Sequence, residues 1–427
     1  MNHARSRQPR ARSYPRARAA AFLALGVMGL ALSACTGTTE TRTPVAILVA
    51  GNTATQGVLD VYASGLPEDP NDPQDVLTLL PTFRQTLAGE VIAVATPAEE
   101  SATRRYVLHR TDRDLLTVFD TAAVDLADPS SLGPVGTAID LGARVVAAGV
   151  LDEIAAPSDL CTTAMAVSSD GAWLGVIHDL SACSSASSVP AALLIELAPS
   201  AGTVARVLPT NPSTNDTDLA PSMRDTTSGE QFVWMSVSID PQLRTLNLSS
   251  LSATPGTLAS YPDGFLLPTA FATPSYGVVY TDGDRVAFID PNAAEPSFSE
   301  TWERPSTLTS LSALRTVRGV PGAPILLLSS NGIGFVASLT GGTEENPVSV
   351  GRTSGLIDAV VDPYGYAFVV NATRGTAFDL LGELTNPDAN LRSEGSVNLA
   401  SGMTPVATTW AFVSDTREDV AATFLGR

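Results

Sequence analysis

Apolar and polar residues alternate with a period of two along much of the chain, and this pattern predicts short β-strands rather than helices. One unit recurs, in which an apolar strand, a polar turn and a second apolar strand follow one another. The 33 glycines and 30 prolines are spread through the chain, as many short strands joined by turns require. We therefore predict an all-β fold. The clearest copies of the unit begin at Val45, Tyr106, Met165, Val233, Gly277, Ile325, Ala359 and Trp410.

The spacing of these hairpins predicts a β-propeller. In the C-terminal half, copies begin about 40–50 residues apart, which is the period of propeller blades. A single four-stranded sheet leaves both of its faces open, whereas radial stacking covers each sheet with its neighbours. We predict seven blades, with eight as the alternative. A pair of β-sandwiches or a less regular all-β chain is the competing fold.

The two ends of the predicted propeller indicate how it closes. Val45–Val49 is apolar on both faces, which suits a strand enclosed between two sheets. The last unit, with predicted strands at Trp410–Val413 and Ala421–Leu425, has no further strand before the chain stops at Arg427. Because unpaired strand edges are a liability, we expect Val45–Val49 to pair with this C-terminal hairpin.

The N-terminus has the pattern of an export signal. Residues 1–18 contain six arginines and no acidic residue, and Ala19–Ala34 carries no charge. This apolar run is shorter than the roughly 20 residues that span a bilayer, so it reads as the core of a signal peptide. Leu32-Ser33-Ala34-Cys35 resembles the lipobox of bacterial lipoproteins.

The lipobox resemblance implies that Cys35 carries lipid, palmitate among its acyl chains, and becomes the first residue of the exported protein. We then expect a signal peptide at 1–34, a lipidated flexible tether at 35–44 and a single propeller domain at 45–427. The protein would be anchored in the cell membrane or outer membrane, facing the periplasm or the cell surface. The alternative is an ordinary signal peptide with a chance cysteine.

Charge and cysteine content narrow the choice of partners and compartment. The formal net charge is −19 and the chain contains no lysine, so its surface repels nucleic acid and no nucleic-acid partner is expected. Cys161 and Cys183 flank a predicted hairpin that turns at Ser169-Asp170-Gly171. An even pair of cysteines in an exported chain usually bridges, so we predict a Cys161–Cys183 disulfide.

Candidate chemistry is sparse. His109 and His178 are the only histidines after the signal peptide, and we expect a structural role for each. No serine-hydrolase elbow, zinc helix or phosphate-binding loop is present, so we assign no catalytic residue. Calcium prefers oxygen-rich loops with 6–8 ligands, which makes it the one cofactor we consider. Its weak candidate ligands are Asp69, Asn71, Asp72 and Asp75 in one loop and Asp282 and Asp284 in another.

Two hairpins, Ala166–Asp179 and Val360–Ala372, resemble the repeats of YVTN-type and TolB-type propellers, whereas the Gly-His and Trp-Asp pairs of WD40 repeats are absent. The lack of a catalytic set favours a non-catalytic module that binds a protein or glycan of the cell envelope. A scaffold role, as in TolB-type propellers, is related to this. The alternative is an enzyme resembling propeller lactonases or other hydrolases, using carboxylates and calcium.

Overall fold

The computed structural model describes most of the chain between Pro44 and Ser414. The described residues are 44–64, 79–97, 103–128, 130–184, 190–197, 207–209, 222–224, 229–236, 242–251, 256–260, 270–272, 278–289, 298–316, 325–336, 348–352, 354–363, 366–379, 393–399 and 402–414. The predicted signal peptide, Cys35 and the C-terminal strand at Ala421–Leu425 lie outside them.

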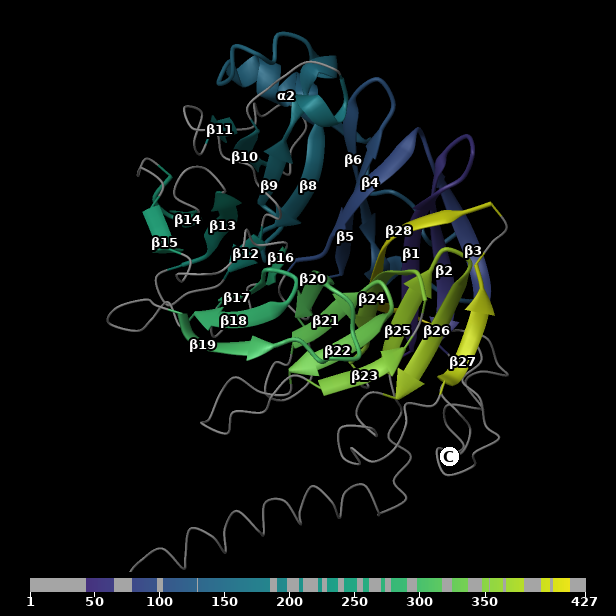
Figure 1. Cartoon of the computed structure of the whole chain (residues 1–427). Coiled ribbons are helices and arrows are strands. Elements are labelled where there is room, and N and C mark those ends of the chain that lie inside the picture. The colour runs from purple at the N-terminus through teal and green to yellow at the C-terminus, as the bar shows by residue number, and fades with distance from the viewer. Residues whose placement is uncertain are drawn as a thin grey trace, which may run out of the picture. The chain divides into compact units, whose positions relative to one another are not determined.

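The described strands form seven four-stranded antiparallel sheets (Figure 1). The first combines β28 (Thr404–Phe412), β1 (Val45–Asn52), β2 (Gly57–Ser64) and β3 (Leu79–Leu87) in that order. The second contains β4 (Glu90–Ala95), β5 (Arg104–Arg110), β6 (Asp114–Asp120) and β7 (Ile139–Asp140). The third contains β8 (Thr162–Val167), β9 (Trp173–His178), β10 (Ala191–Glu196) and β11 (Val207–Pro209).

Four further sheets follow in chain order. They consist of β12 (Ser222–Arg224), β13 (Gln231–Ser236), β14 (Gln242–Asn247) and β15 (Gly256–Ser260); then β16 (Ala270–Ala272), β17 (Val278–Thr281), β18 (Arg285–Ile289) and β19 (Phe298–Glu303). The last two consist of β20 (Leu311–Thr316), β21 (Ile325–Ser329), β22 (Gly332–Val336) and β23 (Val348–Arg352); then β24 (Leu356–Val361), β25 (Tyr366–Asn371), β26 (Arg374–Asp379) and β27 (Ser393–Asn398).

Strands from the two ends of the described chain pair with each other. β1 pairs antiparallel with β28, with Val45 opposite Phe412 and Ile47 opposite Trp410. β1 also pairs with β2, so it lies inside the sheet, and its residues from Val45 to Ala50 are buried. An enclosed strand needs apolar side chains on both faces, which explains the unbroken apolar run. A single strand, β28, supplies this pairing, and it begins earlier than the predicted Trp410–Val413.

One α-helix lies between β7 and β8 and was not expected from the sequence. α2 (Leu141–Ala148) begins after Asp140, whose side chain accepts a hydrogen bond from the Ala143 N–H, and ends at Gly149 in the left-handed conformation with φ 61°. These are an ordinary N-cap and C-cap. The described residues also contain three short 3₁₀ turns: η1 (Thr121–Ala123) after β6, η2 (Pro157–Asp159) after α2 and η3 (Leu180–Ala182) after β9.

Buried apolar clusters join neighbouring sheets. Leu108 and Leu116 of the second sheet pack with Val176 and Leu193 of the third in one cluster, which also takes in Leu141 of α2. Other clusters join the first sheet to the second and the seventh, the third to the fourth, the fifth to the sixth and the sixth to the seventh. The first-named strands of neighbouring sheets are also in contact. β24 contacts β28, and β28 contacts β4. Packing of neighbouring sheets face to face in this way is typical of a propeller.

Candidate functional site

A polar network crosses three neighbouring first strands: β20, β24 and β28. Its centre is Asp358 of β24, whose side chain is 3% exposed. One carboxylate oxygen, Oδ1, accepts from Arg315 of β20, at 3.1 Å from Nε and 2.9 Å from Nη2. The other, Oδ2, accepts from the Thr408 N–H of β28 at 2.8 Å and lies 3.2 Å from the Thr408 hydroxyl. One buried carboxylate thus links three sheets.

The network continues from β28 toward the second sheet. The Thr409 and Thr96 hydroxyls lie 3.0 Å apart, and Thr96 directly follows β4. Arg105 of β5 is 3% exposed and donates from Nη2 to the Trp410 carbonyl at 2.5 Å. Polar groups therefore meet along β28 on both sides, where apolar packing would otherwise be expected.

Arg315 is the part of this network that solvent reaches. Its side chain is 45% exposed, while Nη1 also donates to the Leu314 carbonyl at 3.0 Å. A guanidinium has five N–H donors in a fixed plane, so the donors that Asp358 and the Leu314 carbonyl do not use can face a ligand. Such a group binds carboxylates and oxyanions by charge-assisted hydrogen bonds.

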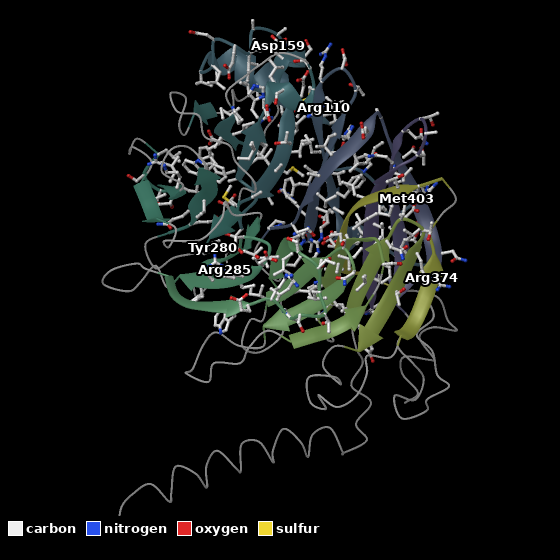
Figure 2. The ribbon with its side chains drawn as sticks, viewed as in Figure 1. Arg110, Asp159, Tyr280, Arg285, Arg374 and Met403 are labelled. Atoms are coloured by element: carbon white, nitrogen blue, oxygen red, sulfur yellow. A yellow bond between two sulfur atoms is a disulfide. The ribbon has the colours of Figure 1, made fainter. Side chains whose placement is uncertain are left out.

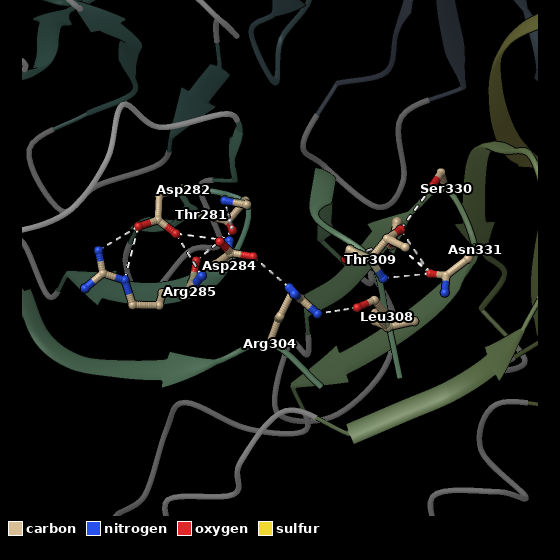
Figure 3. Close-up of polar contacts among 11 residues, drawn as sticks. Thr281, Asp282, Asp284, Arg285, Arg304, Leu308, Thr309, Ser330 and Asn331 are labelled. Atoms are coloured by element: carbon tan, nitrogen blue, oxygen red, sulfur yellow. Dashed lines mark hydrogen bonds and ion pairs between the residues drawn. The ribbon is translucent and has the colours of Figure 1, made fainter. Parts of the chain in front are cut away.

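Asp282 and Asp284, two weak calcium candidates, lie in the β17–β18 turn (Figure 3). Asp282 Oδ2 pairs with Arg285 Nη2 at 2.8 Å, and Oδ1 accepts from the Arg285 N–H at 2.8 Å. Asp284 Oδ1 pairs with Arg304 Nε at 2.9 Å. Each carboxylate is thus engaged by its own arginine, and the geometry gives both a structural role. Calcium binding at this turn stays a prediction.

The same turn is tied to the sixth sheet. The Leu311 N–H donates to the Gly283 carbonyl at 2.7 Å, and Arg304 Nη1 donates to the Leu308 carbonyl. Beyond it, the Thr309 N–H donates to Asn331 Oδ1 at 2.9 Å in the β21–β22 turn (Figure 3). Gly283 has φ 97°, a conformation that favours glycine. This cluster joins the fifth and sixth sheets and is well explained as architecture.

The second and third sheets meet at another buried polar cluster. Asp114 is fully buried and pairs with Arg110 Nε at 2.6 Å, while its other oxygen accepts from the Thr162 N–H at 2.6 Å. Figure 2 labels Arg110 among the side chains of this part of the molecule. Arg110 also donates to the Thr162 carbonyl at 2.7 Å.

The predicted disulfide between Cys161 and Cys183 is confirmed, with the Cα atoms 6.0 Å apart.

His109 is held on both ring nitrogens. Nδ1 lies 2.6 Å from the Ala88 carbonyl and Nε2 lies 2.8 Å from the Thr117 hydroxyl. A carbonyl only accepts, so Nδ1 carries the proton and the Thr117 hydroxyl donates to Nε2. Burial lowers the pKa of His109, since the charged ring would be poorly solvated there. These contacts use both nitrogens, as expected of a structural histidine.

The remaining predicted ligands, Asp69, Asn71, Asp72 and Asp75, lie outside the described residues. Within the described part of the chain, no group of three or more His, Cys, Asp and Glu side chains is placed to hold a metal ion. No helix there is long and apolar enough to cross a membrane.

Nothing in the sequence patterns singled out Arg315, Asp358 or Thr408 as site residues. One signal was available: Asp358 interrupts an apolar strand, LIDAVV, where a charged residue is unexpected unless it is paired. Nothing in the sequence indicates the partners, because Arg315 and Thr408 lie 43 and 50 residues away. Only the packing of three sheets brings the three side chains together.

Solved structures of propeller-like proteins resemble this chain. A periplasmic gluconolactonase from Pseudomonas aeruginosa matches with a TM-score of 0.57 and 12% identity, covering 87% of this chain and 100% of its own. A proposed 6-phosphogluconolactonase from Bacteroides fragilis matches with a TM-score of 0.53 and 11% identity, covering 87% and 99%. Another from Bacteroides uniformis matches at 0.52 and 10%, covering 86% and 100%. No protein-family model and no curated protein sequence matches the chain.

At these identities the likeness concerns the fold: the chain is a mostly-β protein of the β-propeller type. The comparisons nevertheless contradict our preference for a non-catalytic binding or scaffold module, because the similar structures carry the names of lactonases. They agree better with the hydrolase that we kept as the alternative.

Proposed function

We propose that the chain is an exported hydrolase of cyclic esters, with its site at Arg315 where β20, β24 and β28 adjoin. The observation that carries the proposal is the half-exposed Arg315 guanidinium held by a buried carboxylate, in a fold shared with a gluconolactonase. Sugar lactones are the substrate class, by analogy with the names of the similar structures.

Lactone hydrolysis needs a group that stabilises negative charge. Water adds to the carbonyl carbon, the ring C–O bond breaks, and the product is a hydroxy acid that ionises to a carboxylate. Negative charge first develops on the carbonyl oxygen, and N–H donors aimed at that oxygen lower the barrier. Arg315 is the proposed donor. Asp358 acts as a positioning residue, because it fixes the guanidinium plane from behind.

The architecture proposed with this site is a seven-bladed propeller. Each four-stranded sheet is one blade, and the β1–β28 pairing closes the ring. Deleting residues 36–50 should then abolish cooperative unfolding, because it removes most of β1, whereas deleting 36–43 should leave the unfolding transition unchanged. Equal behaviour of the two deletions would contradict the closure.

Export and lipid anchoring at Cys35 are part of the same proposal. The lipobox supports them, and the name of the Pseudomonas aeruginosa neighbour places that protein in the periplasm. Replacing Cys35 with Ser should release the protein from the membrane fraction and stop palmitate labelling. Continued labelling of Cys35→Ser would refute the anchor without touching the enzymatic proposal.

The activity is tested on the purified full chain. Ring opening of glucono-δ-lactone is followed by proton release, with the spontaneous rate subtracted, and an acyclic sugar ester and a nitrophenyl ester serve as comparison substrates. We expect lactone opening at least tenfold above the spontaneous rate and little turnover of the acyclic esters. No acceleration with glucono-δ-lactone and with a panel of larger and phosphorylated lactones would contradict the proposal.

A further inference from the structure

His178 lies at the end of β9, directly opposite Thr162 at the start of β8, and is completely buried. The Cys161 N–H donates to its Nδ1 at 3.0 Å. A ring nitrogen that accepts a hydrogen bond cannot carry a proton, so neutral His178 has its proton on Nε2. The structure therefore sets the tautomer of this histidine through a backbone amide.

The Nε2 side of the ring faces a carboxylate without reaching it. Nε2 lies 3.9 Å from Glu153 Oε1, which is too far for a hydrogen bond, and no other described residue gives Nε2 a hydrogen-bond partner. Glu153 belongs to the segment between α2 and η2, and its side chain is 41% exposed. It can therefore move toward the ring if the ring becomes charged.

Three carboxylates act on His178 from the elements around it. Glu153 approaches from the α2–η2 segment, Asp114 from β6, and Asp179 directly follows β9. Asp114 is already paired with Arg110, whereas the Glu153 carboxylate lies 3.9 Å from Nε2 and is available to a charged ring. Burial lowers the pKa of His178, and the three carboxylates oppose that effect.

The bond to His178 holds one end of the disulfide. Cys161 is tied by its bridge to Cys183, by its carbonyl to the Asp179 N–H at 2.9 Å, and by its own N–H to His178. Cys161 is completely buried, whereas Cys183 is exposed. Losing the His178 acceptor would leave the buried Cys161 N–H without its partner, which is unfavourable.

We propose that His178 is an acid-sensitive latch on the disulfide-bearing end of the third sheet. In the neutral state, Nδ1 accepts a hydrogen bond from the Cys161 N–H and so holds Cys161, directly before β8, in place. When Nδ1 takes a proton from solvent, it can no longer accept, and the charged ring turns its N–H groups toward Glu153. The Cys161 end is then released, while the disulfide itself stays intact.

The test uses the full chain labelled with ¹⁵N-histidine, which contains only three histidines. At neutral pH, the His178 ring should show the Nε2–H tautomer. Hydrogen exchange read by mass spectrometry on peptides covering Cys161 gives its protection factor, corrected for the intrinsic rate at each pH. We expect this protection factor to fall at least tenfold as His178 protonates, with no matching change at His109.

Two variants distinguish the His178 latch from a non-specific loosening of the whole protein at low pH. His178→Asn keeps an acceptor near the Nδ1 position but does not titrate, so protection at Cys161 should become independent of pH between 7.5 and the pH at which carboxylates protonate. If that variant does not fold, Glu153→Gln decides, since removing the negative charge should lower the pH at which protection is lost. An Nδ1–H tautomer, a His178 that stays neutral down to pH 4, titration without loss of protection, or an unshifted midpoint in Glu153→Gln would each overturn the latch.

Discussion

Two buried aspartates with arginine partners serve different ends in this molecule. Asp282 pairs with Arg285 three residues away, inside one hairpin turn, and its carboxylate also accepts backbone N–H groups of that turn. Asp358 pairs with Arg315 from another sheet and accepts from the backbone of a third. The arginine side chains are 30% and 45% exposed, respectively. The first pair shapes a turn, whereas the second presents a cation where three sheets meet.

The difference teaches where chemistry can be placed in such a fold. A turn that satisfies its own carboxylate has little left to offer a ligand, because both Asp282 oxygens are engaged by the backbone and the arginine of that turn. A carboxylate supplied by one sheet and an arginine supplied by the next leave the arginine side chain more exposed, at 45% for Arg315 against 30% for Arg285. The proposed site therefore depends on packing between sheets rather than on any single repeat.

Replacing Asp358 with Ala should give the largest loss of stability. The substitution leaves the Arg315 guanidinium and the Thr408 N–H without the carboxylate to which they donate hydrogen bonds. Breaking a fully buried pair costs about 3–5 kcal/mol, and because Arg315 can still reach solvent we expect about 2–3 kcal/mol. Urea unfolding measures the change. A cost below about 0.5 kcal/mol would show that the three-sheet network contributes little.

Replacing Asp282 with Ala should cost less. The loss is that of a local turn, comparable with losing a helix-capping aspartate, at about 1–2 kcal/mol. Because the Gly283 carbonyl of this turn also accepts from the Leu311 N–H at the start of β20, hydrogen exchange should rise at Gly283 and Leu311 and remain unchanged at Thr408. If Asp282→Ala proved more damaging than Asp358→Ala, the comparison between a local and a cross-sheet pair would be reversed.

The buried histidines should give a smaller, pH-dependent effect. Burial lowers the pKa of both His109 and His178 in the folded protein. Their contribution to stability is then present above the unfolded-state pKa of about 6.5 and is lost as pH falls from there toward the lowered folded-state values. Urea midpoints measured from pH 7.5 to 5.5 should decrease. A midpoint that rises over this range would mean that the charged form is favoured in the folded state.

Much of the fold could be predicted because it is encoded in local pattern. The alternation of apolar and polar residues predicted the strands of the sheets. The apolar run at Val45–Val49 predicted an enclosed strand. The pair of cysteines on either side of a hairpin predicted the Cys161–Cys183 disulfide. The helix α2 was missed although Asp140 and Gly149 cap it, because eight residues give too short a period to stand out among strands.

The candidate site could not be predicted, for a physical reason. Asp282 and Asp284 flank Gly283 in the sequence, which made that turn a weak calcium candidate, and in the structure each of the two carboxylates pairs with an arginine. Arg315 and Asp358 meet only because two sheets pack face to face, and side-chain chemistry between repeats leaves no spacing rule in the sequence. The absence of a recognised motif in the sequence therefore decides neither for nor against catalysis.

The central claim is tested most directly by comparing lactone hydrolysis in Arg315→Gln, Arg285→Gln and Arg374→Gln. Arg374 is exposed at the start of β26 and serves as the matched surface control (Figure 2). We predict that Arg315→Gln lowers kcat/KM at least a hundredfold, comparable with removing an oxyanion-stabilising donor, while the other two variants stay within about threefold of the unmodified protein. Circular dichroism and urea midpoints confirm that each variant is folded. A folded Arg315→Gln protein with unchanged kcat/KM would contradict the account.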